Sequence, residues 1–371
     1  MSVKFAYWVP NVSGGLVVSK LPQRTDWTFE YNRQLACVAE QAGFDYALSQ
    51  ARFFASYGAE KQLEALTLTS ALAAVTQKIK LISAIHPGLW HPGVIAKAVA
   101  TIDHISNGRA AVNIVSGWFK GEFIGYGEPW LDHDERYRRS EEFIRVLKGL
   151  WTQETFTFKG DFYRINEAPL KPKPMQRPHP EIFQGGNSKA ARRMAARVSD
   201  WYFMNGASVE KIAEQIAEIR ALALEEGRDP DTIRFGVNGF VILRDTEKEA
   251  HEALREIIAH ADAEAVEGFR QQVQFAGNAS PEKQGMWAES KFEDLVQYND
   301  GFKTRLIGTE EQIVERIAAY EAVGVDLVLC GFLHFTDELP RFGERIIPQV
   351  QTLPSRRGTR AAGGRAFAEV A

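Results

Sequence analysis

The segment AAVNIVSGWFKGE, residues 110–122, changes from an apolar strand pattern to a polar, Gly-containing loop. Val112, Ile114 and Val115 are β-branched, which is typical of a strand covered on both faces. Asn113 interrupts this run, and a buried amide without a hydrogen-bond partner costs about 1–3 kcal/mol. In parallel α/β folds, ligands bind at the carboxyl ends of the strands. Asn113 is therefore either a site residue or an amide that a neighbouring loop satisfies, and this segment alone favours neither.

Strand-like and helix-like segments alternate along most of the chain. The predicted strands cover residues 5–9, 46–48, 79–85, 110–115, 181–184, 201–205, 235–243 and 326–330. The predicted helices cover residues 26–42 (with Asp26 as the N-cap), 63–76, 92–105, 135–151, 188–198, 210–226, 247–275, 309–323 and 338–350. Eight strands that alternate with helices indicate an α/β protein of the (β/α)₈ TIM-barrel class with insertions. The alternative is an open doubly wound sheet, but residues 9–20 contain no GxGxxG turn after the first strand.

Two segments interrupt this alternation and are predicted to be insertions in a single domain of residues 1–350. Residues 154–180 read as a β-hairpin followed by a Pro-rich extended run. Residues 276–305 are irregular and polar with scattered aromatics. A loop of this length without secondary structure is uncommon unless it is functional, so we expect a lid over the barrel mouth. Residues 354–371 are rich in Gly, Arg and Ala and are predicted to form a flexible tail.

Composition narrows the class of protein. The chain has 371 residues, of which 45% are hydrophobic and 25% charged, as in ordinary globular proteins. Its formal net charge of −4 offers no general attraction to nucleic acid or to an anionic membrane. No apolar run is long enough to span a bilayer, and the first residues lack a signal-peptide pattern. Cys37 and Cys330 are isolated, as in proteins of reducing compartments. We expect a cytoplasmic protein with no nucleic-acid or membrane partner.

Two segments predict an anion site. In QGGNS, residues 184–188, the glycines let the backbone approach a ligand, while Ser188 and the helix N–H groups donate to it. In DERYRR, residues 134–139, Arg136 and Tyr137 combine a guanidinium with a phenol, which suits a phosphate. The alternatives are a plain turn with Ser188 as the N-cap and a solvated helix end with i,i+4 ion pairs.

Other polar residues follow predicted strands. Arg52 comes after the second strand, where a position at the barrel mouth favours a site role over a surface charge. His334 follows the eighth strand and is a candidate acid, base or orienting residue. His86 and His91 have poor spacing for a metal and no carboxylate beside them, so we expect no metal site. The predicted site therefore has an anion-binding end and many aromatic residues near the barrel mouth, but no evident nucleophile. This combination indicates that a cofactor performs the chemistry.

The chain resembles the bacterial luciferase-like superfamily of flavin-dependent monooxygenases. The segments that carry this resemblance occur in the family's order: ATIDHISNGR (100–109), VNIVSGW (112–118), DERYRRSEEFIRVLKGLW (134–151), FKGDFYRI (158–165) and EIFQGGNSKAARRMAARVSDW (181–201). Residues 5–20 and 292–309 are most similar to the branch that oxidises a small sulfone, and a related group opens pyrimidine rings. The resemblance implies oxygen-dependent cleavage of a C–S bond of dimethyl sulfone, which gives methanesulfinate and formaldehyde.

The same resemblance implies reduced FMN as the cofactor, supplied by a separate NADH-dependent reductase. It also implies a homodimer or homotetramer. Asn113 and Glu122 would then lie at the flavin ring, with Arg52 near the ring or the substrate and His334 on the substrate side. Asn113, Arg52 and His334 are the expected catalytic residues. The expected phosphate ligands are Arg136, Tyr137, Gly186 and Ser188.

The expected substrate pocket follows from differences within the superfamily. Where the alkanesulfonate members carry an Arg and a His, this chain has Asn238 and Phe240. An anionic sulfonate wants cationic partners, whereas a neutral sulfone needs only hydrogen-bond donors and an apolar wall. We therefore expect Trp8, Asn238, Phe240 and Phe332 to line the pocket. A Thr on the oxygen side of the pyrimidine-cleaving members is Ala84 here.

Other functions stay open at this point. The same chemistry on an alkanesulfonate, another small organosulfur compound or a heterocycle is one alternative. Hydride transfer from a deazaflavin on the same barrel is a second, and flavin binding without catalysis is a third.

Overall fold

Eight parallel strands close into a barrel in the computed structural model, which describes residues 3–278, 287 and 289–354. In the order in which they pair around the barrel, the strands are β1 (Lys4–Val9), β12 (Leu327–Gly331), β9 (Arg234–Phe240), β8 (Trp201–Met204), β7 (Glu181–Gly185), β4 (Ala110–Ile114), β3 (Lys80–Ile85) and β2 (Tyr46–Ser49). The barrel closes where β1 meets β12, with Lys4 paired to Leu327. The predicted TIM barrel is confirmed, and the open sheet is excluded.

The alternation of side chains along each strand determines which residues enter the barrel. In β4, Ala111 belongs to the inner cluster, whereas Val112 and Ile114 pack in the outer core under the helices. On the inside, the ring of Phe183 stacks on Trp201 with centroids 5.0 Å apart. Because the period is two, Asn113 lies on the same side of the strand as Ala111. The β4 sequence therefore directs the Asn113 amide into the barrel at its carboxyl end.

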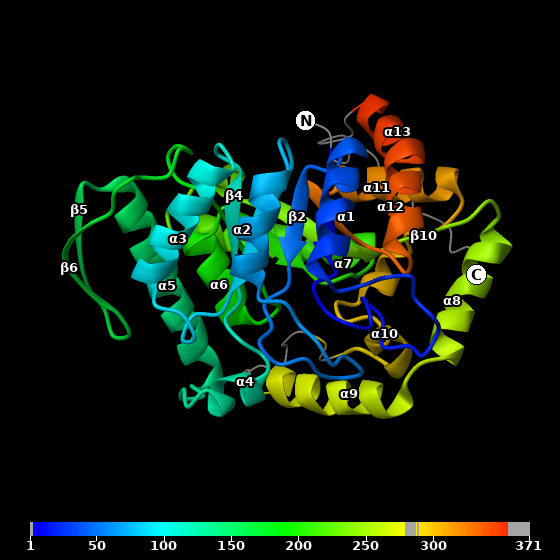
Figure 1. Ribbon diagram of the computed structural model, residues 1–371, viewed down its shortest axis with the longest axis horizontal. Helices are drawn as coiled ribbons and strands as arrows, with labels where there is room; N and C mark the ends of the chain where they lie inside the picture. Colours follow the sequence, from blue (N-terminus) through cyan, green and yellow to red (C-terminus); the bar gives the residue numbers. More distant parts are fainter. Residues whose placement is uncertain (1–2, 279–286, 288, 355–371) are drawn as a thin grey trace.

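Helices cover the barrel on its outside (Figure 1). They are α1 (Phe29–Gln41), α2 (Ala65–Val75), α3 (Pro92–Ile105), α5 (His133–Thr152), α6 (Lys189–Val198), α7 (Val209–Glu225), α11 (Glu310–Ala322), α12 (Phe335–Arg345) and α13 (Ile347–Thr352). The predicted N-cap of the first helix is wrong. Thr28 occupies that position and accepts from the backbone N–H of Tyr31, while the Asp26 carboxylate accepts from the Thr28 hydroxyl. The last predicted helix is two helices and begins three residues earlier, at Phe335.

The predicted β-hairpin is confirmed. Strands β5 (Thr155–Lys159) and β6 (Arg164–Pro169) pair antiparallel and project from the side of the molecule beside α5 (Figure 1). The Glu142 carboxylate, on α5, accepts from the backbone N–H groups of Asp161 and Phe162 and so ties the hairpin turn to the barrel.

The single long helix predicted for residues 247–275 is wrong. The chain forms α8 (Glu247–Ala259) and α9 (Ala263–Asn278), which run in different directions (Figure 1). At the break, the Ser19 hydroxyl donates to the carbonyls of Ile257 and His260, and Ser19 bridges to Ala261. No Gly or Pro marks this position, but Asp262 directly precedes α9 and its carboxylate accepts from the backbone N–H of Ala265 at 3.3 Å, as a capping residue does.

The remaining elements are short. Most lie around the barrel mouth, but residues 230–232 directly precede β9 and so lie at the opposite end of the barrel. They are α4 (Lys120–Gly125), which was not predicted, η1 (Pro230–Thr232), β10 (Ile242–Leu243), α10 (Phe292–Leu295), η2 (Gly301–Thr304) and β11 (Ile307–Gly308). β10 pairs with β11, so the strand predicted for residues 235–243 is split in two. Figure 1 shows α4, α9 and α10 along one edge of the molecule. The predicted lid falls partly outside the described residues, and the predicted tail does so almost entirely. No described helix is long and apolar enough to cross a membrane.

Candidate active site

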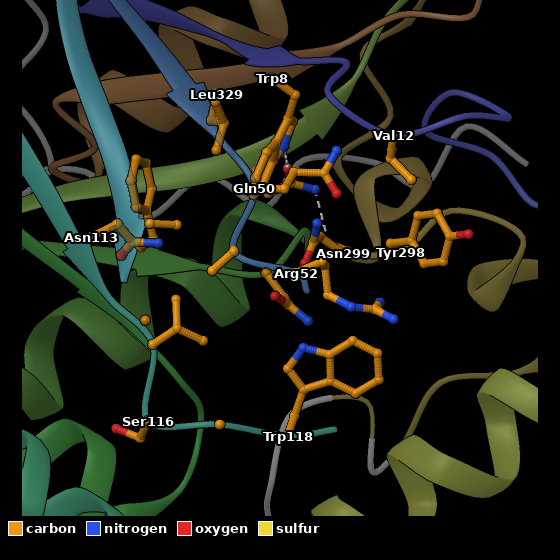
Figure 2. Close-up of a pocket in the computed structure, with 18 of the residues that line it drawn as sticks. Trp8, Val12, Gln50, Arg52, Asn113, Ser116, Trp118, Tyr298, Asn299 and Leu329 are labelled. Carbon is orange, nitrogen blue, oxygen red and sulfur yellow. Dashed lines mark hydrogen bonds between the residues drawn. The ribbon is translucent and has the colours of Figure 1, made fainter. Parts of the chain in front are cut away.

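A cavity of about 1230 Å³, part of it open to solvent, lies at the carboxyl ends of the barrel strands. Part of its polar lining comes from residues at or just after these strand ends: Trp8, Gln50, Arg52, Asn113 and Ser116 (Figure 2), together with Asn205 and Asn238. Phe269, Trp287 and Tyr298, from α9 and the segment that follows it, complete the wall. Part of the segment predicted as a lid therefore does line the cavity.

The Asn113 amide points into this cavity (Figure 2). Its Oδ1 atom is buried and has no hydrogen-bond partner among the described residues, and the same holds for the Ser116 hydroxyl. A buried polar atom without a partner is costly, so such atoms mark places where a ligand completes the bonding. The neighbouring loop within the described chain does not satisfy the Asn113 oxygen, which disfavours the purely structural interpretation of this residue.

Arg52 is held rigidly at the mouth. Its Nε donates to Oε1 of Glu122 at 3.1 Å, and its Nη2 donates to the carbonyl oxygen of Phe54 at 2.9 Å. The guanidinium carbon lies 4.9 Å from the ring centroids of both Trp118 and Phe119. Cation–π contacts of this kind orient a guanidinium without neutralising it. Arg52 thus presents a fixed positive charge to the cavity.

Glu122 lies behind Arg52, outside the cavity lining, which differs from its expected place at the flavin ring. It is fully buried, and its Oε1 also accepts from the backbone N–H groups of Phe53 and Phe54. Its Oε2 lies 3.7 Å from Nε2 of His86. Burial lowers the pKa of His86, although the Glu122 charge opposes this. Glu122 therefore acts on the site through Arg52 and the loop after β2.

Flat apolar surfaces close the cavity on the side away from the barrel. The Trp118 ring packs edge-to-face against Phe269 at 5.6 Å and against Trp287 at 5.7 Å. Tyr298 packs on Phe269 and donates its hydroxyl to the carbonyl oxygen of Tyr57. Burial raises the pKa of Tyr298 to about 12, so this phenol is neutral. Such walls accept a flat aromatic ligand and exclude water from it.

Tyr137 lines one end of the cavity, and Gly186 and Ser188 contact it from outside the lining. Gly186 has φ +135°, and a β-carbon there would lie 2.8 Å from the Tyr137 hydroxyl oxygen and 2.7 Å from Cβ of Ala191. Ser188 caps α6 by accepting from the backbone N–H of Ala191, as predicted, and it also hydrogen bonds to Tyr137. Burial raises the pKa of Tyr137. The hydroxyls of Tyr137 and Ser188 lie at the N-terminus of α6, next to the backbone of Gly186, which has no side chain. Such an arrangement suits an anion.

Arg136 does not join this group. Its guanidinium carbon lies 4.1 Å from the Trp130 ring centroid, and its Nη1 donates to the carbonyl oxygen of Leu131. Burial lowers the pKa of Arg136. It does not line the cavity. The sequence could not distinguish Arg136 from Tyr137, because consecutive helical residues point about 100° apart and either one can face the site.

Trp8 and Asn238 are joined directly. The Trp8 indole Nε1 donates to Oδ1 of Asn238 at 2.5 Å, and Nδ2 of Asn238 donates to the carbonyl oxygen of Asn299 at 3.0 Å (Figure 2). Both residues line the cavity, as expected. However, the Asn238 amide already binds the barrel to the segment around Asn299, so its main contribution is to hold that segment in place.

Three predicted substrate-side residues lie elsewhere. Phe240 is fully buried and packs against Phe302 at 5.1 Å, away from the cavity lining. Phe332 packs against Phe335 and other rings under α12. His334 precedes α12, where its Nδ1 accepts from the backbone N–H of Arg24 at 3.1 Å. None of these three residues is among those that line the cavity: Phe240 ends β9, and Phe332 and His334 lie between β12 and α12. Their expected roles on the substrate side stay predictions.

Further polar residues line the cavity beside those predicted to bind cofactor or substrate. Three of them, Gln50, Ser116 and Asn205, follow β2, β4 and β8. The strand-end rule that singled out Asn113 applies to each of them. No described residues form a group of three or more His, Cys, Asp or Glu side chains suited to a metal ion.

A barrel of parallel strands with a cavity of this kind at its mouth defines a class of enzyme. Residues 3–327 match the model of the luciferase-like monooxygenase family, and the chain belongs to that family. The superfamily resemblance of the sequence is confirmed.

Named relatives are similar over nearly the whole chain. The FMNH2-dependent dimethylsulfone monooxygenase of Pseudomonas putida is 64% identical over 355 residues, which is 96% of this chain and 97% of the relative. The enzyme of the same name from Pseudomonas fluorescens (strain Pf0-1) is 62% identical over 355 residues, 96% of each chain. Among solved structures, a riboflavin lyase with modified FMN and riboflavin superposes with a TM-score of 0.81 at 21% identity, covering 95% of this chain and 92% of that one. At that identity the likeness supports the fold alone.

Proposed function

We propose that this protein is an FMNH2-dependent monooxygenase that cleaves dimethyl sulfone. Dimethyl sulfone, O2 and FMNH2 would give methanesulfinate, formaldehyde, FMN and water, which balances atoms and electrons. The observation that carries the proposal is the 64% identity to the Pseudomonas putida enzyme across almost the full length of both chains.

The cavity residues fit FMN. The orphaned oxygens of Asn113 and Ser116 suit the hydrogen-bonding edge of a flavin ring, and the rings of Trp118 and Trp287 suit its faces. Tyr137 and the backbone at Gly186 and Ser188 suit the phosphate. These residues would hold the cofactor, and a bound reduced flavin supplies the electrons that activate O2. Arg136 packs on Trp130 and does not line the cavity, while its buried Nε has no partner among the described residues, so its expected role at the phosphate stays a prediction.

The chain's own residues then have defined roles. Asn113 orients the ring, and Arg52 provides a fixed positive charge and a hydrogen-bond donor beside it. The aromatic wall of Trp118, Phe269 and Trp287 keeps water away from the reacting atoms. We assign no proton transfer to these groups. They contribute orientation and electrostatic stabilisation, and preorganised electrostatics usually accelerate an enzymatic reaction more than any other single effect.

The charge of the cavity favours a neutral substrate. Among the described residues that line it, Arg52 is the one ionised side chain, and Glu122 lies within 3.1 Å of it. A sulfonate carries a full negative charge and would need further cations to offset its desolvation. A sulfone is neutral and needs hydrogen-bond donors only. The second candidate, an alkanesulfonate, is therefore less favoured.

The proposal extends to partners. An enzyme that depends on reduced flavin needs a separate NADH-dependent reductase to supply it, and we propose that both work in the cytoplasm. We also propose a homodimer or homotetramer. The exposed side chains of α2 are small and uncharged (Thr67 and Ala74), and α2 contains no charged residue at all. An outer helix without charge is typical of a subunit interface.

A substrate panel tests the proposal. Enzyme, NADH, FMN and a flavin reductase are incubated with dimethyl sulfone, methanesulfonate or uracil, and formaldehyde or ring-opened product is measured. We expect formaldehyde from dimethyl sulfone and at least tenfold lower kcat/KM for the other two. Preferential turnover of methanesulfonate would establish the second candidate. Tight binding of a reduced deazaflavin without oxygen uptake would indicate hydride transfer.

A further inference from the structure

We infer that Gln50 is a substrate-binding residue that donates a hydrogen bond from its side-chain amide to an oxygen of the sulfone. The inference rests on the proposed function and names the group that recognises its substrate. Gln50 directly follows β2, which ends at Ser49, and its side chain lines the cavity (Figure 2).

The backbone of Gln50 is fixed before any ligand binds. Its N–H donates to Oδ1 of Asn11 at 3.1 Å, and its carbonyl oxygen accepts from Nδ2 of the same Asn11 at 3.2 Å. Asn11 is fully buried, and its Nδ2 also donates to the carbonyl oxygen of Leu63 at 2.8 Å. The Asn11 amide therefore hydrogen bonds to both the N–H and the carbonyl oxygen of Gln50, which holds the Gln50 backbone in one conformation. The direction of the Gln50 side chain is therefore preorganised.

The side chain itself is left without a partner. The Nε2 atom of Gln50 is buried and donates to no acceptor among the described residues. Removing an N–H group from water without giving it an acceptor is unfavourable, so the empty donor indicates that a ligand supplies the acceptor. Because Gln50 lines a cavity that opens to solvent, an acceptor can reach it.

Neighbouring polar groups do not offer an equivalent donor. The Trp8 indole N–H is taken by Asn238, and Asn238 in turn donates to Asn299. The Tyr298 hydroxyl donates to the carbonyl oxygen of Tyr57. Gln62 also lines the cavity, but its Nε2 donates to the carbonyl oxygen of Leu63. Gln50 is thus an amide of this wall whose donor nitrogen is both buried and without an acceptor within the described chain.

The chemistry of a sulfone matches this arrangement. Its two oxygens accept hydrogen bonds strongly, it has no acidic hydrogen to donate, and its two methyl groups are apolar. A neutral amide N–H binds such an oxygen without demanding a negative charge. The donor of Gln50 therefore suits a neutral acceptor bound in the cavity, whose lining also includes Arg52.

The test uses two variants of the full-length enzyme. Gln50→Met keeps the length of the side chain and removes the donor. Gln62→Met is the matched control, because it removes an amide from the same cavity wall whose N–H is already used. For each protein, the dissociation constant of dimethyl sulfone is measured by calorimetry on the FMN-bound enzyme, together with the affinity for FMN, the melting temperature and the KM and kcat for formaldehyde release.

We expect Gln50→Met to raise the dissociation constant and KM for dimethyl sulfone about tenfold, which corresponds to about 1.4 kcal/mol. FMN affinity should stay within twofold for both variants, and the sulfone affinity of Gln62→Met should stay within threefold. Unchanged sulfone affinity in Gln50→Met, or an equal loss in both variants, overturns the inference. Wild-type enzyme that binds dimethyl sulfone but releases no formaldehyde would sink the proposed reaction, while the Gln50→Met affinity still decides the role of Gln50. Wild-type enzyme that does not bind the sulfone overturns both.

Discussion

Arg52 donates through Nε to the fully buried carboxylate of Glu122, and this pair connects the loop after β2 to α4. Removing one partner of a buried ion pair leaves the other charge uncompensated. We therefore predict that Glu122→Ala lowers the free energy of unfolding by about 3 kcal/mol, as measured by urea denaturation. The control is Glu135→Ala, whose partner Arg138 is exposed, with an expected loss below about 1 kcal/mol. Equal effects of the two substitutions would show that Glu122 does not stabilise the loop.

Asn113→Ala should separate cofactor binding from product formation. The phosphate end at Tyr137 and Ser188 is untouched, so FMN affinity is expected to fall less than about fivefold, since a single neutral hydrogen bond is worth about 1 kcal/mol. Without the amide that orients the ring, oxygen should be consumed with little formaldehyde. Oxygen uptake and formaldehyde are measured in the same reaction. A product yield like that of the wild type would return Asn113 to a structural role.

Gly186→Ala should weaken FMN binding at least tenfold. A methyl group at this position would contact the Tyr137 hydroxyl at 2.8 Å and Ala191 at 2.7 Å, at a φ of +135°. Gly127→Ala is the control, because Gly127 also has a positive φ, +78°, but nothing lies within 4 Å of the added carbon. FMN affinity is measured by quenching of flavin fluorescence. If both variants lose affinity equally, backbone strain and not crowding of the phosphate end explains the effect.

Glu181, at the end of the barrel opposite the cavity, should make the free energy of unfolding depend on pH in the acid range. Burial raises the pKa of this carboxyl, but the charges of Lys80 and Arg234 and their hydrogen bonds outweigh burial and hold it at about 2, against a usual 4.5. A carboxyl whose pKa is lower in the folded than in the unfolded state stabilises the fold at a pH above its unfolded-state pKa. This stability is lost as the pH falls from about 4.5 towards 2. The contribution is on the order of 3 kcal/mol at neutral pH. Glu181→Gln should flatten the fall in the free energy of unfolding in that pH window, and an unchanged slope would contradict this assignment.

Much of the barrel could be predicted from sequence because the apolar and capping patterns that mark its strands and helices lie within each element. The apolar residues of β4 and the cap at Ser188 are read from neighbouring positions, and both are confirmed. The break between α8 and α9 was missed because no Gly or Pro marks it, although Asp262 caps the start of α9 and Ser19 binds the end of α8 from a distant loop. The N-cap of α1 was placed two residues early, at Asp26, because Asp26 and Thr28 are both good capping residues.

The sequence predicted those residues of the candidate site whose position follows from the carboxyl end of a strand. Trp8, Arg52 and Asn113 line the cavity because each lies at or just beyond the carboxyl end of a barrel strand. Phe332 and His334 follow a strand as well, but contacts with α12 and with the backbone of Arg24 hold them outside the mouth. Such long-range contacts leave no periodicity in the sequence. Gln50 was missed for another reason, since nothing in the sequence shows that Asn11 fixes its backbone.

The stoichiometry of formaldehyde release tests the central claim most directly. Chemically reduced FMN is mixed with the wild-type enzyme, dimethyl sulfone and oxygen, and formaldehyde is measured per FMNH2 oxidised. We predict a yield that approaches equimolar with saturating sulfone and falls to background under argon or without sulfone. FMNH2 oxidation that proceeds with FMN bound but yields no formaldehyde at any sulfone concentration would contradict the proposed reaction.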